Sequence, residues 1–138
     1  MTPLIILWVI FAHWVADFVC QTHWMASNKS KDWWALVDHV SVYTFVVTVL
    51  LAPWLITKFG NLIVVFLLVT FVAHFITDAI TSRITSRLFM SQFVVPPKWT
   101  VDIHMKPDFT LHWFFVVIGF DQFLHYAQLF LTLAWVMK

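Results

Sequence analysis

The sequence has no glutamate, only two glycines and a single cysteine, and each scarcity excludes something. Glutamate is common on helix surfaces that face water, so its absence indicates that few helix faces are solvated. One cysteine, Cys20, can form neither an intramolecular disulfide nor a zinc site that needs several thiolates. Charged residues make up 11% of the chain, where a water-soluble domain carries about 25%, and the net charge of +1 offers no basic patch for nucleic acid.

Apolar residues are what the chain has in abundance: 62% of its 138 residues are hydrophobic, and the mean hydropathy is +0.86. Four apolar runs, at about residues 3–24, 33–56, 62–80 and 111–136, are each close to the ~20 residues that a helix needs to cross a ~30 Å hydrocarbon core. Asp32 can cap the second run. The sequence therefore predicts an all-α fold, a four-helix transmembrane bundle that forms one domain over residues 1–138.

The connectors between these runs differ in length. Residues 58–61, which include a glycine and an asparagine, predict a tight turn. In the long connector from residue 81 to 110, the first part (Ser82–Phe93) has basic and apolar residues at helical spacing. This suits an extension of the third span or a short interfacial amphipathic helix between the third and fourth spans. The second part contains three prolines and is predicted to be irregular.

Basic residues predict the orientation. The first and third connectors lie on one side of the membrane and carry six lysines and arginines, while the other side has only Lys58 and Lys138. Basic residues favour the cytoplasmic side, so we expect both of these connectors in the cytoplasm and both termini outside. Tryptophans cluster near both predicted interfaces, where amphipathic rings are favoured.

Histidines and aspartates recur inside all four runs. Three runs carry a His/Asp pair spaced i, i+4, which places both side chains on one helical face, and the second run carries His39 with Asp38 before it. Counted at ~1.5 Å per residue, these residues lie roughly 7 to 20 Å from the predicted cytoplasmic helix ends, so a bundle can bring them to one level. The pairs are His13 with Asp17, His74 with Asp78, and Asp121 with His125.

A structural role for these residues has to be weighed against a functional one. Membrane helices use polar side chains for interhelical hydrogen bonds, and His39 alone is explained in that way. Three aspartates are not, because each costs roughly 2.5 to 3.5 kcal/mol inside a bilayer, while an interhelical hydrogen bond returns about 1 kcal/mol. The spans have no lysine or arginine at this level, and a bound divalent cation would supply the countercharge.

Seven side chains are candidate ligands, more than the four that a tetrahedral zinc ion takes. Two ions about 3.5 to 4 Å apart, with a bridging carboxylate and an open position for water, would use them all. The alternative is one ion, with aspartates that orient its histidine ligands. Mixed imidazole and carboxylate ligation fits zinc first, and also iron or manganese. The candidate ligands are His13, Asp17, His39, His74, Asp78, Asp121 and His125, with Gln21 and Gln122 as supporting polar groups.

Other uses of these residue types fit less well. Facing histidines could hold a haem, but a porphyrin has no use for three nearby carboxylates, and its bulk requires small residues that these Phe-rich and Trp-rich helices lack. Histidines and aspartates in connectors or at helix ends, among them His23 and His112, are expected to be solvated. Asp38 points away from His39 on the helix and is a weak candidate.

The ordered motifs resemble a known family. They are His13-x3-Asp17-Phe18-x2-Gln21, Lys29, Leu36-x2-His39, His74-Phe75-x2-Asp78 and Asp121-Gln122-x2-His125. Together they are similar to the pattern of small multi-spanning membrane proteins of bacteria and phages, catalogued as a domain of unknown function, number 3307 in that series. The resemblance covers nearly the whole chain and implies a bacterial-type inner (plasma) membrane, but it implies no activity. The layout is also similar to that of membrane-bound metal-dependent hydrolases.

These observations favour a membrane-embedded, metal-dependent hydrolase. A metal-bound water would be the nucleophile, and one of Asp17, Asp78 and Asp121 would be the base. At this depth in the lipid bilayer we expect a lipid-borne phosphate or ester as substrate. Two alternatives stay open: an ion or proton carrier that uses the same residues, and a phage or bacterial membrane protein that binds partners without catalysis. A carrier would need polar residues through the outer half of the spans, which is nearly bare of them.

Overall fold

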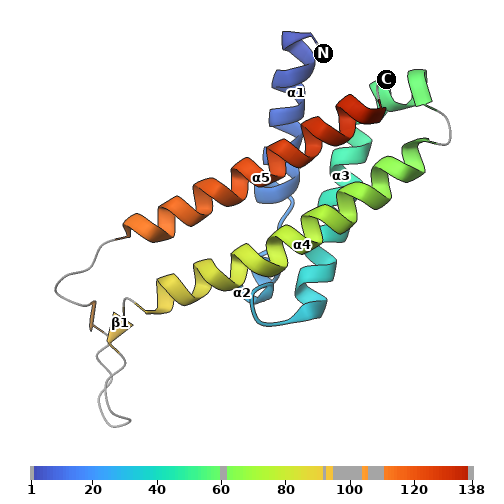
Figure 1. Cartoon of the computed structure of the whole chain (residues 1–138). Helices are drawn as coiled ribbons and strands as arrows, with labels where there is room; N and C mark the ends of the chain where they lie inside the picture. The colour runs from blue at the N-terminus through green and yellow to red at the C-terminus, as the bar shows by residue number, and fades with distance from the viewer. Residues whose placement is uncertain (1, 60–61, 92, 95–103, 106–110, 137–138) are drawn as a thin grey trace.

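Helices account for nearly all of the part of the chain that the structure, a computed structural model, describes: residues 2–59, 62–91, 93–94, 104–105 and 111–136. This confirms the predicted all-α class (Figure 1). A π-helical turn, η1, follows the first helix, and a short helix, α2, precedes the second long one. The elements are α1 (Pro3–Trp14), η1 (Val15–Val19), α2 (His23–Asn28), α3 (Trp33–Phe59), α4 (Leu62–Met90) and α5 (His112–Val136).

Three of these helices are long and apolar enough to cross a membrane. They are α3, over Trp33–Ile56, and the whole of α4 and α5. Each exceeds the ~20 residues that the hydrocarbon core demands. α1 and η1 together form a shorter apolar segment, Pro3–Val19. The chain thus has the helices of a membrane protein.

The first predicted helix, residues 3–24, ends earlier than expected. In the π turn the Cys20 N–H donates to the Val15 carbonyl at 2.9 Å, and the helix stops there. The Thr22 side chain then accepts from the Met25 N–H at 3.2 Å and begins α2. The prediction of one helix to residue 24 is therefore wrong, because a threonine N-cap inside the apolar run starts a new helix.

The second predicted helix begins where the sequence indicated. Asp32 caps α3, because its Oδ1 accepts from the Trp34 N–H at 2.8 Å. The helix continues through Pro53 to Phe59, beyond the predicted end at residue 56. A proline removes one backbone donor, but near the end of a membrane helix neighbouring groups compensate for the loss.

The third helix is longer than predicted, and the fourth matches its prediction. α4 runs unbroken to Met90, beyond the predicted end at residue 80, so residues 82–90 extend the third span, which is one of the two alternatives that the sequence left open. The Ser82 and Thr85 hydroxyls of this extension donate to carbonyls one turn back, which keeps polar residues compatible with the helix. α5 covers almost the whole of the predicted run 111–136.

The long connector contributes one small antiparallel ladder to the described residues. Strand β1 (Phe93–Val94) pairs with β2 (His104–Met105), with Phe93 opposite Met105. No separate short helix stands between α4 and α5 in the described part of this connector. The three prolines of this connector, and the glycine and asparagine of the expected turn at 58–61, lie outside the described residues.

The helices form an up-and-down arrangement. α1 lies beside α3, and α4 and α5 pair with each other and cross the first pair (Figure 1). Both chain ends lie near the junction between α3 and α4, whereas α2 and the β-ladder lie toward the opposite end. This alternation brings the His/Asp motifs of all the long helices to a common level.

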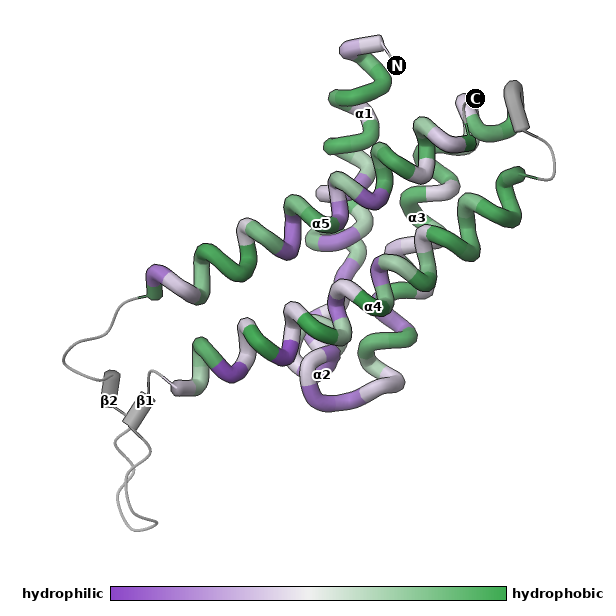
Figure 2. Tube along the Cα trace, in the orientation of Figure 1, coloured by the Kyte–Doolittle hydropathy of each residue, from purple (hydrophilic) through white to green (hydrophobic). Residues whose placement is uncertain are grey.

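Buried side chains divide the bundle into two halves. The half nearer the chain ends, here called the apolar half, packs aliphatic and aromatic side chains: Val9, Val47, Leu51, Leu55, Phe66, Leu129 and Leu133. The half nearer α2, here called the polar half, buries ionisable side chains at 4% exposure or less: His13, Asp17, His39, His74, Asp78 and His125. Hydrophilic residues accordingly concentrate around α2 and the middle of the bundle in Figure 2.

Candidate metal centre

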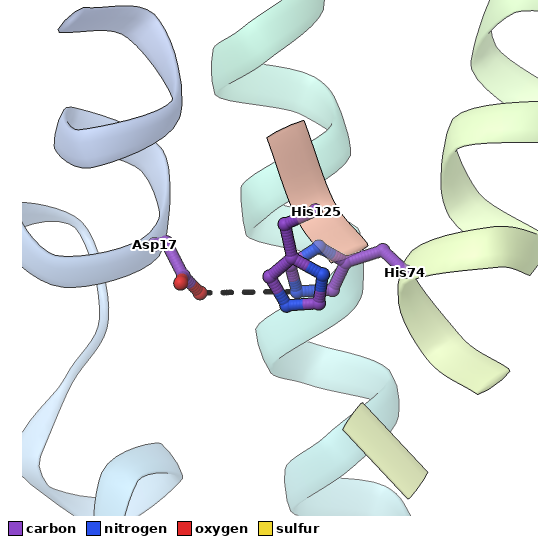
Figure 3. Close-up of side chains that lie close together, drawn as sticks. All are labelled: Asp17, His74 and His125. Atoms are coloured by element: carbon purple, nitrogen blue, oxygen red, sulfur yellow. Dashed lines mark ion pairs between the residues drawn. The ribbon is translucent and has the colours of Figure 1, made fainter. Parts of the chain in front are cut away.

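A π-helical turn positions Asp17. The i→i+5 bond of η1 inserts one extra residue into the turn, which rotates the following side chains relative to a regular α-helix. Asp17 is 4% exposed and points across the bundle at the stacked rings of His74 and His125 (Figure 3). Its Oδ1 lies 3.1 Å from His39 Nε2 and 3.8 Å from His74 Nε2. π turns of this kind are frequent at functional sites.

Asp78, on α4, is the centre of the cluster. Its Oδ1 lies 3.1 Å from His125 Nε2, and its Oδ2 lies 3.1 Å from His39 Nε2 and 3.6 Å from His74 Nε2. The carboxylate is 1% exposed. One carboxylate therefore faces the Nε2 atoms of histidines from α3, α4 and α5.

The Nε2 atom of His39 has more polar neighbours than one N–H can serve. Within 3.3 Å of it lie carboxylate oxygens of Asp17 and Asp78, the Nε2 of His74 and the Nζ of Lys29. An imidazole nitrogen donates one hydrogen bond or accepts one, so most of these close approaches are not satisfied by hydrogen bonding alone. Three of these four neighbours carry lone pairs, whereas Lys29 Nζ is itself a cationic donor. Convergence of lone pairs on one point is the arrangement that a cation would satisfy.

Lys29, the residue after α2, contributes a positive charge to the cluster. Its Nζ donates to Asp78 Oδ2 at 2.9 Å and lies 3.2 Å from His39 Nε2. The side chain is 18% exposed, so it reaches the buried carboxylate from the solvent side. We expected no lysine or arginine at this level, and Lys29 corrects that expectation. Its flexible stem carries the ammonium group from the connector into the bundle.

Asp121, on α5, lies at the edge of the cluster and is 17% exposed at its side chain. Its Oδ1 accepts from the Thr81 hydroxyl at 2.5 Å and lies 3.7 Å from His125 Nε2. Its Oδ2 accepts from the Gln122 amide at 3.1 Å. Asp121 thus faces both the buried histidines and the more open part of the site.

His13 has both ring nitrogens engaged by neutral groups. Its Nε2 lies 2.9 Å from Gln122 Oε1, which can only accept, so this nitrogen carries a proton. Its Nδ1 lies 2.9 Å from the Tyr43 hydroxyl. The Gln122 amide nitrogen in turn lies 3.3 Å from Asp17 Oδ2. The hydrogen bonds of His13 thus run to Gln122 and Tyr43, and its Nε2 also lies 3.8 Å from Asp17 Oδ2. Its role as a metal ligand stays a prediction.

Ring stacking holds the histidines in place. Tyr43 stacks on His74 with centroids 3.7 Å apart, and His74 stacks on His125 with centroids 4.1 Å apart. Stacked rings lose rotational freedom, so their Nε2 atoms stay directed at the carboxylates. The Nδ1 atoms of His39, His74 and His125 are buried without a hydrogen-bond partner, so the polar contacts of these rings are concentrated on Nε2.

Three overlapping groups in the described residues bring ligand atoms within 4.8 Å of one another, as a metal ion requires. They include six of the seven predicted ligands and leave out His13. All of these residues are oxygen or imidazole donors that suit zinc, iron or manganese. The residues present therefore fit a divalent metal. The groups are Asp17 with His74 and His125, His39 with His74 and Asp78, and Asp78 with Asp121 and His125.

A cavity of about 520 Å³ adjoins the cluster. Asp17, Asp78, Asp121 and Gln122 contribute to its wall, and so does Gln21, whose Oε1 is buried without a hydrogen-bond partner. Its size is typical of pockets for small ligands. The two glutamines that the sequence named as supporting groups thus differ in role: Gln122 is bonded inside the cluster, whereas Gln21 faces the cavity.

Three contributors were not predicted as site residues. Tyr43 lies four residues after His39, and Thr81 lies three after Asp78, so helical spacing alone could have identified both. Lys29 belongs to the motif set, but its position in a connector gave no sign that it enters the bundle. His23, His112 and Asp38, expected to be outside the site, are exposed.

Comparison with known proteins places the chain in one family. The model of the family described as "Protein of unknown function (DUF3307)" matches residues 4–138, nearly the whole chain. The chain therefore belongs to the DUF3307 family, as the ordered motifs predicted. Neither the curated proteins nor the solved structures gave a match.

Proposed function

We propose that this member of the DUF3307 family is a membrane-embedded, metal-dependent hydrolase that acts on a lipid-borne phosphate or ester. One observation carries the proposal: the Nε2 atoms of three stacked or facing histidines and the oxygens of buried aspartates converge beside a ligand-sized cavity. Interhelical hydrogen bonding does not require such convergence. A hydrolytic site requires it, together with room for a substrate.

The residues divide into holding and proton-transfer roles. His39, His74 and Asp78 form one of the three groups and would hold a divalent ion, which when bound supplies Lewis acidity and an activated water; Asp78 also faces His125. Asp121 is the best-placed base, because it adjoins the cavity and only one of its oxygens lies near His125. Stacking by Tyr43 and the amide of Gln122 would keep the holding residues oriented, as outer hydrogen-bonding partners do in metal sites.

The charge of the cluster favours one ion over two. Asp17, Asp78 and Asp121 contribute three negative charges, and Lys29 contributes one positive charge. One divalent ion brings the total to zero with neutral histidines, whereas two divalent ions leave an excess of two positive charges in a buried site. The dinuclear centre expected from the sequence assumed no such cation. With Lys29 in place, we propose a single ion, with zinc as the first choice.

We also propose that α1 and η1 form a fourth membrane crossing. Their 17 residues give a helix of about 25 Å, which a locally thinned bilayer accommodates at modest cost. Trp8 packs against Trp54 near the chain ends, while Trp33 packs under Arg83 at the α2 end, as an aromatic belt at each interface would. In this topology both termini lie outside, and Lys29 and Arg83 lie on the cytoplasmic side.

An ion or proton carrier is the alternative that the same residues could serve. A carrier needs a polar route across the whole bundle, and the apolar half opposes it. Val9, Val47, Leu55, Phe66 and Leu129 are each fully buried there, directly beyond the histidines. A site that is open to a cavity on one side and backed by packed side chains on the other suits catalysis better than conduction.

Metal analysis of the detergent-purified full chain tests the proposal. We expect about one equivalent of a transition metal per chain, hydrolysis of phosphoester or ester lipids in mixed micelles, and loss of both after chelation. His74→Ala should abolish both, and added metal should not restore them. His23→Ala is the matched control, because His23 is exposed on α2 and should leave metal content unchanged.

Two results would contradict the proposal. One is a metal-free protein whose stability is unaffected by His74→Ala and Asp78→Asn. The other is proton or cation flux in proteoliposomes that these substitutions abolish, with no hydrolysis of any lipid ester, which would favour a carrier.

A further inference from the structure

The cavity beside the metal centre has a hydroxyl-lined wall. Thr81, Ser82, Thr85 and Ser86 follow Asp78 along α4 at helical spacings of three and four residues, so that one face of the helix meets the cavity from the cluster outward. Ser27, in α2, and Ser30, two residues after α2, also line the cavity. Polar side chains therefore continue along the cavity beyond the residues that could bind a metal.

Two of the α4 hydroxyls of this wall, those of Ser82 and Thr85, are left as hydrogen-bond acceptors. The Ser82 hydroxyl donates to the Asp78 carbonyl at 2.5 Å and that of Thr85 to the Thr81 carbonyl at 2.7 Å, so their protons are used within the helix. Both residues line the cavity, and their oxygen lone pairs remain available to accept. Gln21 adds an unpartnered carbonyl oxygen. A ligand that satisfies these atoms must donate hydrogen bonds, as the hydroxyl groups of a polyol do.

The basic side chains that line the cavity are Lys29 and Lys31. Arg83 is close in sequence but turned elsewhere, because its guanidinium group lies 4.0 Å from the Trp33 ring centre and donates to the Ala79 carbonyl. Lys29 is paired with Asp78, and Lys31 is exposed at the cavity. An anionic group such as a phosphate would meet Lys31 directly and lie within reach of Lys29.

The rest of the lining is apolar. Phe89 and Phe114 contact each other with centroids 5.4 Å apart, and Phe18, Met90 and Ile118 complete the apolar part. Side chains of this kind suit an alkyl chain next to the polar wall. A ligand that satisfies all three parts of the cavity is therefore an amphiphile with a phosphate and free hydroxyl groups.

We propose that the cavity binds the headgroup of a membrane lipid that carries a phosphate and a free polyol, with Lys31 near the phosphate and the α4 hydroxyls near the polyol. The inference that this headgroup is the substrate rests on the proposed hydrolase function. The binding itself does not, because the lysines, hydroxyls and apolar residues that hold the lipid lie outside the metal-holding set.

The test is lipid retention by the full chain in chelator, measured by native mass spectrometry from mixed vesicles. Phosphatidylglycerol has both a phosphate and free hydroxyls, phosphatidylcholine lacks the hydroxyls, and a galactosyl diacylglycerol lacks the phosphate. We expect phosphatidylglycerol to be retained about tenfold more than either of the others. Soluble glycerol 1-phosphate is offered as a competitor and should displace the lipid only weakly, because it lacks the alkyl chains.

Two substitutions, each with a control, test whether the retained lipid occupies this cavity. Ser86→Leu fills the hydroxyl wall and should reduce phosphatidylglycerol retention about tenfold, while Ser41→Leu, at an exposed serine of α3, should not. Lys31→Gln should reduce retention about fivefold, as loss of one lysine near an anionic lipid does. Arg87→Gln is the charge-matched control, because Arg87 is exposed on α4 and does not line the cavity.

Equal retention of all three lipids, or equal loss in Ser86→Leu and Ser41→Leu, would overturn the inference. Displacement of the lipid by an equal concentration of glycerol 1-phosphate would also overturn it, because the ligand would then be a free phosphopolyol. These outcomes are independent of the hydrolase. Selective lipid retention by a protein that never binds metal would support the lipid site and contradict the proposed hydrolase. Metal-dependent hydrolysis without selective lipid retention would support the hydrolase and contradict the lipid site.

Discussion

The polar half and the apolar half of the bundle are made from the same long helices, but they are stabilised in opposite ways. In the apolar half, residues such as Phe66 and Leu129 are fully buried against other apolar side chains, and packing alone holds them. In the polar half, Asp78 and His74 are buried just as completely and need specific partners from three other elements. The apolar half therefore stabilises the bundle by packing, whereas the polar half holds the candidate site.

The difference shows where the unfavourable free energy of burying ionisable groups is concentrated. Buried carboxylates in a bilayer each cost several kcal/mol if they are uncompensated, and a bundle as apolar as its other half would avoid that cost. The chain instead brings three aspartates, three histidines and Lys29 together beside a cavity. Concentration of the costly ionisable groups next to a cavity is what a functional site requires.

The largest expected effect breaks the polar half at its centre. Asp78→Asn keeps the shape of the side chain but removes the charge that faces three histidines and Lys29. Metal affinity should fall by more than the 10–100-fold that follows loss of an outer partner, and hydrolysis should vanish. Metal analysis and a micellar assay measure both. Asp38→Asn is the control, since Asp38 is exposed on α3; equal metal content in the two variants would contradict the assignment.

The next effect compares two glutamines of α5, one in each half. Gln122→Leu removes the amide between His13, Asp17 and Asp121 and should lower metal affinity about 10–100-fold, with the fold intact. Gln128→Leu removes a bond to the Thr70 carbonyl and should leave metal affinity unchanged. Titration with a competing chelator measures the affinities. The same affinity in both variants would show that Gln122 does not position the ligands.

A third substitution breaks the apolar half. Phe66→Ala should lower the free energy of unfolding by about 2 kcal/mol, less than the ~3–5 kcal/mol of water-soluble cores, because lipid also solvates the unfolded helices. Metal content per folded chain should stay the same. Phe45→Ala, at a side chain that is 68% exposed, should cost little. Unfolding in mixed micelles is the measurement, and loss of metal in Phe66→Ala would mean that the two halves are not separable.

Lys29→Met tests whether the ammonium charge of Lys29 contributes to the charge balance of the polar half. Without metal, the variant leaves Asp78 without its ammonium partner and should be less stable than the parent chain. Its metal affinity should rise about tenfold, because no fixed cation then repels the ion. Added zinc should therefore stabilise the variant more than the parent in thermal unfolding. If zinc restores nothing, Lys29 is a structural partner of Asp78 and the single-ion centre is wrong.

The smallest expected effect concerns Tyr43. Tyr43→Phe removes the hydroxyl that meets His13 but keeps the ring stacked on His74. Loss of one hydrogen bond to a neutral group is worth about 1 kcal/mol, so metal affinity should fall no more than about fivefold. Tyr43→Leu removes the stacking as well and should have the larger effect. Equal losses in the two variants would assign the role of Tyr43 to its hydroxyl.

Much of the fold could be predicted from the sequence because its signals are local. Apolar runs longer than a membrane is thick predict helices, and Asp32 marks the start of α3. The end of the first helix could not be predicted, because a single threonine, Thr22, outweighed the apolar pattern around it. The sequence left open whether residues 82–93 extend the third span or form a separate interfacial helix, and in the structure α4 continues to Met90. Hydroxyl groups that bond within the helix let such a polar segment stay helical.

For the candidate site, too, local sequence patterns predicted one part and tertiary contacts decided the other. In α4 and α5 the i, i+4 spacing of His with Asp determined, from sequence alone, which side chains share a helical face, because the geometry of a regular α-helix is fixed. Which of them meet was decided by the tertiary structure, since contacts between helices depend on the crossing of α4 and α5 over α3 and on the π turn at Asp17. Only the folded chain brings Lys29 to Asp78 and directs His13 to Gln122. Such contacts join residues far apart in sequence, where no local pattern records them.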